Sequence, residues 1–194
     1  MLRVAALAAT ALVAAGCGSQ AAAPPPPPTP SQTVTDGAHG LAFDLPPEWH
    51  RATVSLTPGL GDPREVLSAG TFPLEYRPTA CSHVPGSALA DLGPRDAFVT
   101  IEERGSDPSS SWSDFPPRPA HFGPGLGGPS EAQACVPQGH FADHWFGFSD
   151  GGRHFHVLVA FGPSAPETVQ RQAWALLDSL QIDPRVQPGW NSVG

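Results

Sequence analysis

Residues 145–162 read WFGFSDGGRHFHVLVAFG, and this stretch decides the fold. Two apolar segments, 139–148 and 153–161, flank Ser-Asp-Gly-Gly, which is typical of the tight turn of a β-hairpin. Side chains of the second segment alternate between two faces, neither purely polar, so we expect this strand to lie centrally with cover on both sides. One face carries Phe155, Val157, Val159 and Phe161, and the other carries His154, His156, Leu158 and Ala160.

An amphipathic helix is expected directly after this hairpin. Gly162 and Pro163 end the strand, and Ser164 to Glu167 match a capping box with proline in the first helical turn. Apolar residues then recur at helical spacing over about sixteen residues. They are Val169, Ala173, Leu176, Leu177 and Leu180.

Shorter elements precede the hairpin. Alternating or β-branched runs predict strands at 41–45, 54–56, 66–72 and 97–103, and a helical turn at 88–92. Residues 105–129 form the longest irregular stretch, since their prolines cannot donate to a sheet. We therefore predict an α+β domain, with an antiparallel sheet packed against the C-terminal helix and helices possible on both faces.

The N-terminal residues resemble a bacterial lipoprotein signal. Residues 4–15 are small and apolar, too short to span a bilayer core of ~30 Å, and fit a signal-peptide core. The following Cys17 resembles the cysteine of a lipobox, although Ala14 stands where Leu, Val or Ile is usual. The resemblance implies a signal in residues 1–17 and acyl chains such as palmitate on Cys17. The alternative is an ordinary secretory signal, cleaved at a neighbouring bond.

Such an anchor places the protein on the outer face of a bacterial plasma membrane, because several acyl chains together hold a protein without a transmembrane helix. Residues 18–38 contain five consecutive prolines and predict an extended tether. A proline-rich ligand for an SH3-like domain is the alternative for this segment. A single domain over residues 39–184 and a flexible tail over 185–194 complete the predicted organisation.

Charge excludes one class of partner. The chain has 18 acidic residues against 10 arginines, no lysine and a net charge of −8. Nucleic-acid binding needs clustered cations, so nucleic acid is not an expected partner. The expected partners are the membrane, through the anchor, and an envelope protein or wall component, with the chain itself monomeric.

Three cysteines fit an exported chain. With Cys17 lipidated, Cys81 and Cys135 remain as an even pair, which predicts a disulfide. The bond would close a loop of about 55 residues and stabilise the domain by up to about 4 kcal/mol.

Several segments resemble a group of uncharacterised actinobacterial secreted domains. The segments are 41–49, 115–119 with Cys135 about sixteen residues later, and 153–182. The layout is also similar to Mog1/PsbP-like lipoprotein domains. That similarity implies an antiparallel sheet between helices and a role in binding or assembly.

No catalytic motif is present: the sequence has no nucleophile elbow, phosphate loop, dinucleotide fingerprint or His-Glu-x-x-His. We therefore expect a non-enzymatic binding or envelope-assembly role, with no cofactor. Two alternatives stay open, a metal-dependent hydrolase and a carrier of a small apolar ligand.

The hydrolase alternative rests on ligand-type residues, because two cysteines and two histidines can hold zinc. His144, His154 and His156 share one face only if the hairpin loop has three residues, and a two-residue turn separates His144 from the others. The alternative to metal binding is an oxidised cysteine pair with partly solvated histidines. The residues considered are Cys81, His83, Cys135, His140, His144, His154 and His156.

The long loop carries the candidate binding residues, because exposed loop aromatics can anchor a partner. The alternative is that Phe115 and the prolines close the loop onto the core. The candidates are Trp112, Phe115, Pro116, Pro117 and Arg118.

Overall fold

The predicted hairpin forms one side of a five-stranded antiparallel sheet, with its first strand at the edge. The computed structural model describes residues 30–105, 115–136 and 140–186. Strands β6 (Ala142–Asp150) and β7 (Arg153–Phe161) are joined by Gly151 and Gly152 alone, whose φ values of +59° and +77° suit a two-residue hairpin turn. Asp150 therefore pairs with Arg153, and this register fixes the face of every side chain on both strands.

The large sheet has the order β3-β4-β5-β7-β6, with β5 and β7 in its middle. All residues of β5 except Arg104, and all of β7 except His154, are buried, as expected for strands covered on both faces. The remaining bounds in this sheet are β3 (His50–Arg51), β4 (Arg64–Gly70) and β5 (Ala97–Arg104).

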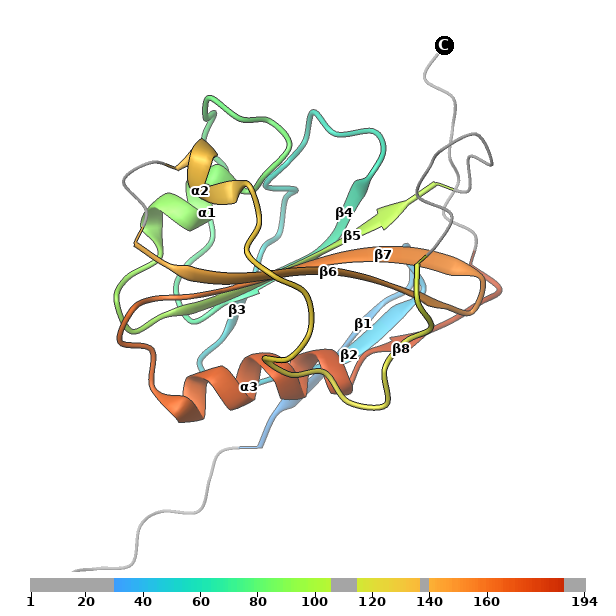
Figure 1. Cartoon of the computed structure of the whole chain (residues 1–194). Helices are drawn as coiled ribbons and strands as arrows, with labels where there is room; N and C mark the ends of the chain where they lie inside the picture. The colour runs from blue at the N-terminus through green and yellow to red at the C-terminus, as the bar shows by residue number, and fades with distance from the viewer. Residues whose placement is uncertain (1–29, 106–114, 137–139, 187–194) are drawn as a thin grey trace, which may run out of the picture.

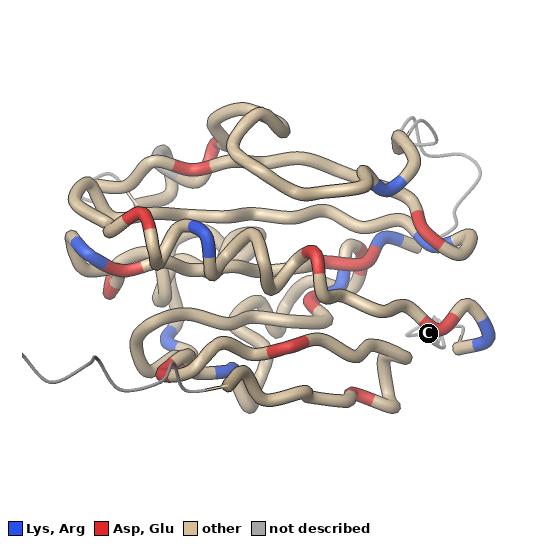
Figure 2. The backbone as a smooth tube through the Cα atoms, turned by 90° about the horizontal axis from the view of Figure 1, so that it is seen from below, with Lys and Arg blue, Asp and Glu red and all other residues tan. Residues whose placement is uncertain are grey.

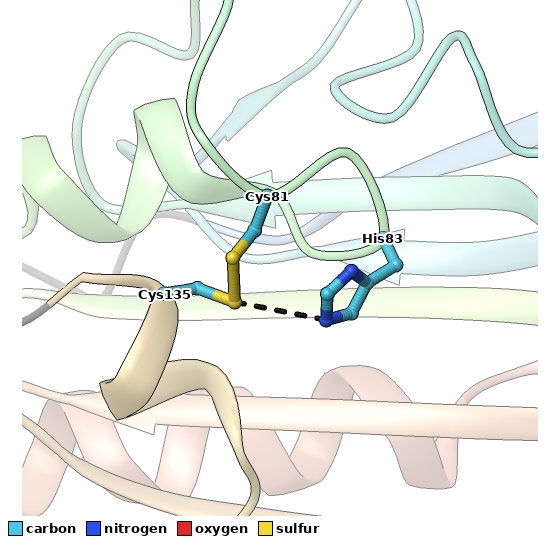
Figure 3. Close-up of side chains that lie close together, drawn as sticks. All are labelled: Cys81, His83 and Cys135. Carbon is cyan, nitrogen blue, oxygen red and sulfur yellow. Dashed lines mark hydrogen bonds between the residues drawn. A yellow bond between two sulfur atoms is a disulfide. The ribbon is translucent and has the colours of Figure 1, made fainter.

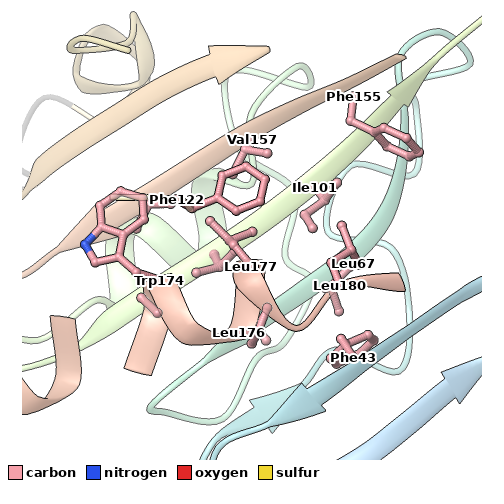
Figure 4. Close-up of a cluster of buried hydrophobic side chains, with 14 of the residues drawn as sticks. Phe43, Leu67, Ile101, Phe122, Phe155, Val157, Trp174, Leu176, Leu177 and Leu180 are labelled. Carbon is pink, nitrogen blue, oxygen red and sulfur yellow. The ribbon is translucent and has the colours of Figure 1, made fainter. Parts of the chain in front are cut away.

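One face of the large sheet is covered by α3 (Glu167–Asp178) and a second, three-stranded sheet (Figure 1). That smaller sheet has the order β1-β2-β8, with β1 at Gln32–Asp36, β2 at Leu41–Leu45 and β8 at Gln181–Ile182. Aromatic and aliphatic side chains from these elements form the larger core (Figure 4). It includes Phe43, Ile101, Phe155, Val157, Leu176 and Leu177.

The opposite face carries two short helices, α1 (Gly86–Asp91) and α2 (Ala132–Cys135), which lie above the large sheet in Figure 1. Leu89 and Ala132 pack there against Phe98 and Leu158 in a second core cluster. The α+β class, the antiparallel sheet and the packing of a C-terminal helix are therefore confirmed, and helices lie on both faces.

A buried ion pair ties the large sheet to the connection between β1 and β2. Arg153 Nε and Nη2 donate to the two carboxylate oxygens of Glu103 at 2.6 and 2.9 Å, and Nη2 also donates to the carbonyl of His39 at 2.9 Å. A two-bonded guanidinium–carboxylate pair fixes orientation as well as charge. The pair therefore positions the small sheet against β7.

Two predicted boundaries and one predicted strand were wrong. β1 lies inside the segment predicted as tether, so the folded domain starts before residue 39. No strand forms at 54–56. The C-terminal helix begins at Glu167, after an N-cap proline without a side-chain cap bond, and ends at Asp178 rather than near residue 181.

The helix ends early because its last turn is held by other elements. The Ser179 hydroxyl donates to the carbonyl of Leu176 and accepts from the backbone N–H of Asp44 on β2. Residues 181–182 then pair with β2 as β8. Within the described residues, no helix is both long and apolar enough to cross a membrane.

Candidate functional site

A pocket of about 460 Å³ lies beside the second core cluster, and we call it the Glu102 pocket. Strand residues Glu102, Arg104, Trp145 and His156 line it from the large sheet. Residues 83–85 and 129–132, which flank α1 and α2, line it as well. Its lining is mainly apolar with a few charged groups, as in most small-molecule sites.

Glu102 is the most unusual side chain of this pocket. It lies on β5 and is only 2% exposed, directly across from His156 on β7 and Glu65 on β4. Burial raises the pKa of its carboxyl to about 7, the carboxylate of Glu65 adds to that rise, and the charge of Arg104 opposes it. No hydrogen bond or ion pair with another described residue occupies the Glu102 carboxyl.

The neighbouring Glu65 is the opposite case. Its Oε2 accepts from Ser55 Oγ, Thr57 Oγ1 and the backbone N–H groups of Leu56 and Thr57, at 2.7 to 3.0 Å. Its Oε1 accepts from Ser68 Oγ at 2.6 Å. Five donors occupy the two oxygens of Glu65, so this side chain is used by the fold, whereas Glu102 keeps its hydrogen-bonding capacity.

His156 is the second titratable group on the sheet side of the pocket. Burial lowers its pKa to about 4, and the charge of Arg104 adds to that fall. The imidazole is therefore neutral at pH 7. Its ring centroid lies 4.9 Å from that of Trp145 and 4.9 Å from that of Phe115.

The disulfide predicted between Cys81 and Cys135 is confirmed, with the two Cα atoms 5.6 Å apart. It links the segment before α1 to the end of α2, close to the residues that line the Glu102 pocket (Figure 3). The exposed His83 lies beside it, with Nε2 3.6 Å from Cys135 Sγ. Cys81, His83 and Cys135 are the one group of three potential metal ligands among the described residues.

The three-histidine metal cluster does not form. The two-residue turn pairs His144 with Val159, whereas His154 and His156 point to the other face of the sheet, so the predicted candidates are separated. His144 instead packs edge-on against Trp174 of α3, with ring centroids 5.4 Å apart.

Four of the five candidate loop residues pack on the edge of the large sheet. Phe115 lies against the rings of His154 and His156. Pro116 and Pro117 run beside Ser149 of β6, whose N–H donates to the Pro116 carbonyl at 2.8 Å. This arrangement matches the alternative in which the loop closes onto the core. Trp112 lies outside the described residues, as does Cys17.

Arg118 is used by the fold. Its guanidinium donates to the carbonyls of Leu177, Asp178 and Leu180, at 2.6 to 3.2 Å, at the C-terminal end of α3. It also pairs with Asp150 at 3.2 Å. A cation in this position satisfies terminal helix carbonyls and complements the helix dipole, so Arg118 stabilises α3.

Sequence reasoning missed Glu102 and Arg104. The alternation in β7 correctly places His156 beside Leu158 and Ala160, but Glu102 reaches that group only when β5 pairs with β7. One signal was available in the sequence. The strand predicted at 97–103 is mostly apolar on both faces but ends with two charged residues, Glu102 and Glu103. Elsewhere, acidic and basic residues are scattered over the described backbone (Figure 2).

Comparison with known families gives a partial match. A family described as a domain of unknown function (DUF8017) matches residues 22–113, slightly less than half of the chain. The matched part includes Cys81, His83 and Glu102, whereas the β6–β7 hairpin and α3 lie beyond it. No curated protein matches the chain.

Proposed function

We propose that this protein is an extracytoplasmic lipoprotein, anchored through Cys17 to the outer face of the plasma membrane, whose domain binds a small ligand in the Glu102 pocket. The observation that carries the binding role is the buried Glu102 carboxyl, which lines a mainly apolar pocket and has no hydrogen bond to a described residue. Burial of a carboxyl costs free energy, and a ligand that donates a hydrogen bond to Glu102 would recover part of that cost.

The lining favours a ligand with an apolar body and a cationic or hydrogen-bond-donating head. Val84, Ala132 and Leu158 offer apolar contacts, and the Trp145 ring adds an aromatic one. Two carboxylates, Glu102 and Glu131, line the pocket against the single guanidinium of Arg104. An amine placed against Glu102 would gain a charge-assisted hydrogen bond in a region of low dielectric.

The hydrolase alternative named His144, His154 and His156, and His144 lies on the opposite face of the sheet from the other two, so these three cannot share one metal ion. The anchoring half of the proposal rests on the lipobox-like residues around Cys17 and on the proline-rich segment that follows. In that setting the domain serves as a binding module in the cell envelope.

The binding half is tested with a matched pair of probes, 2-phenylethylamine and 2-phenylethanol. We expect the amine to shift the indole N–H resonance of Trp145, assigned with Trp145→Phe, at lower concentration than the alcohol does. Glu102→Gln should remove this preference, whereas Glu48→Gln, an exposed control, should keep it. Equal shifts by both probes in the wild type, or no shift at all, would overturn the ligand assignment.

The anchoring half has a separate test in the producing bacterium. Wild-type protein should incorporate a labelled fatty acid and sediment with membranes, and Cys17→Ala should do neither. Label that persists in Cys17→Ala, or wild-type protein without label, would contradict the anchor and leave the pocket assignment standing.

A further inference from the structure

The Cys81, His83 and Cys135 cluster has a geometry that the disulfide alone does not explain. One ligand atom of each residue lies within 4.8 Å of the other two. The three side chains come from two segments, with Cys81 and His83 before α1 and Cys135 at the end of α2 (Figure 3). His83 is exposed and the cysteines are half-buried, so solvent and ions reach the group.

The spacing of the imidazole and sulfur matches one edge of a tetrahedral zinc site. His83 Nε2 lies 3.6 Å from Cys135 Sγ. A zinc ion bound to sulfur at about 2.3 Å and to nitrogen at about 2.0 Å places those atoms about 3.5 Å apart, close to the observed spacing. Zinc binding also requires the two sulfurs to separate to about 3.8 Å once the bond between them is broken, and Cys81 Sγ to settle about 3.5 Å from His83 Nε2.

We propose that, after reduction of the Cys81–Cys135 disulfide, the protein binds one Zn²⁺ ion through both sulfurs and His83 Nε2, with water as the fourth ligand. The site shares His83 with the lining of the Glu102 pocket, but the proposal does not depend on the ligand proposed there. Two thiolates and one imidazole are donors that zinc prefers, and the open fourth position follows from the exposure of His83.

The reduction step needs a dithiol reductant of the thioredoxin class. One of its thiolates attacks a sulfur of the Cys81–Cys135 bond, and its second thiol resolves the mixed disulfide. The reductant ends as a disulfide. Its two electrons and two protons are transferred to Cys81 and Cys135, which become thiols. Zinc then binds as those two thiols release their protons to solvent.

Other contacts hold both halves of the cluster without the disulfide. Thr79 Oγ1 donates to the carbonyl of Cys81 at 2.9 Å. At α2, Ser130 Oγ accepts from the N–H of Ala132 at 3.0 Å, and the N–H of Ser130 donates to Asp143 on β6 at 2.7 Å. Reduction therefore leaves the ligands near their positions, and zinc restores the crosslink.

The test uses the full chain with Cys17→Ser, so that the anchor cysteine adds no thiol. The protein is reduced with a phosphine under anaerobic conditions and titrated with Co²⁺, a spectroscopic substitute for zinc. We expect one equivalent to bind with sulfur-to-cobalt charge-transfer bands and tetrahedral d–d bands, and Zn²⁺ to displace it. Oxidised protein should show neither band.

Two histidine variants separate this site from simple thiol binding. His83→Ala should weaken cobalt binding by roughly tenfold or more and change the d–d spectrum. His121→Ala, whose side chain is 86% exposed, should bind cobalt like the parent protein. Absence of binding to reduced protein, or identical spectra and affinity after His83→Ala, would overturn the proposal.

Near-UV circular dichroism distinguishes metal binding by the folded protein from metal binding by an unfolded chain. The reduced, metal-bound protein should show the aromatic signal of the oxidised protein, either retained on reduction or restored by metal. Cobalt bound to a chain that lacks this signal would count against the site.

Discussion

At the scale of single residues, the contrast between Glu65 and Glu102 determines what the pocket can do. Both carboxyls lie opposite each other on β4 and β5, yet Glu65 accepts five hydrogen bonds whereas Glu102 accepts none from the described residues. Burial raises the pKa of the Glu102 carboxyl to about 7, and the nearby Glu65 adds to that rise, so Glu102 is partly protonated at neutral pH.

Glu102 and His156 should give opposite pH dependences of stability. Glu102 has a folded pKa of about 7 against 4.5 ordinarily, so the folded state holds the extra proton and stability falls between pH 4.5 and 7. His156 has a folded pKa of about 4 against 6.5, so the unfolded state holds the extra proton and stability rises between pH 4 and 6.5. In the wild type the two contributions largely cancel.

Single variants expose each contribution in urea unfolding measured from pH 4 to 8. Glu102→Gln should gain stability with rising pH and exceed the wild type at pH 8 by on the order of 3 kcal/mol. His156→Gln should instead lose stability between pH 4.5 and 7. Three parallel curves would show that neither group titrates differently on folding.

The residue-level chemistry was only partly predictable from the sequence. The disulfide followed from counting cysteines in a chain that was expected to be exported, and the face of His156 followed from alternation along 153–161. Glu102 was not predicted, because its environment comes from Glu65 and His156, which are distant in sequence and meet it only in the assembled sheet.

At the scale of elements, the segment around Phe115 to Arg118 joins the edge of the large sheet to the end of α3. Arg118 donates to three carbonyls there and is only partly exposed. Arg118→Ala should therefore cost about 2 kcal/mol of unfolding free energy, because hydrogen bonds from a charged donor are lost.

Arg171→Ala is the matched control for Arg118→Ala. Arg171 forms an exposed i,i+4 pair with Glu167 on the same helix, so its loss should change stability by under about 0.5 kcal/mol. Amide exchange at the end of α3 should accelerate in Arg118→Ala alone. Equal unfolding midpoints for the two variants would contradict the role assigned to Arg118.

Gly147 has no side chain, which leaves space on β6 for the ring of Phe115. A Cβ at residue 147 would lie 2.5 Å from two ring atoms of Phe115, so Gly147→Ala should displace the ring and destabilise the protein by about 1 to 3 kcal/mol. Combining it with Phe115→Ala should cost less than the sum of the single changes, measured by chemical denaturation. Additive losses would show that the ring is not what Gly147 accommodates.

Helices and strands were predicted correctly where apolar residues recur with a clear period. They were missed where only contacts with a distant segment determine the structure. The hairpin, the helix from Glu167 and the strands around 41–45 and 97–103 carry clear apolar patterns. β1 was missed because its residues are polar and mostly exposed, and only pairing with β2 makes it a strand. The face of His144 depended on the number of turn residues, which alternation leaves open.

At the scale of the whole molecule, the Cys81–Cys135 bond spans 54 residues and holds the face opposite α3. A Cys81→Ser/Cys135→Ser variant should lose up to about 4 kcal/mol of stability, because the unfolded chain regains loop entropy. Thermal unfolding with and without reductant should shift the midpoint of the wild type but leave the double variant unchanged. A wild-type midpoint insensitive to full reduction would contradict this estimate.

The arrangement of a sheet covered on both faces could be predicted from the sequence. An apolar hairpin must be covered on both faces, and α3 supplies one of the two layers. In the second sheet, β8 is two residues long and β1 shows no apolar alternation. The second sheet was therefore not predicted, because it forms by long-range pairing of segments whose own sequences have little strand pattern.

The run of prolines beside β6 also affects how neighbouring molecules can meet. Pro116 and Pro117 lie against Ser149 and have no N–H to offer an incoming strand, while Trp145 exchanges backbone hydrogen bonds with Gly128 farther along. This rim of the large sheet is thus closed to fibril-like growth. Two copies of the domain can therefore touch along this rim without pairing their strands into aggregates.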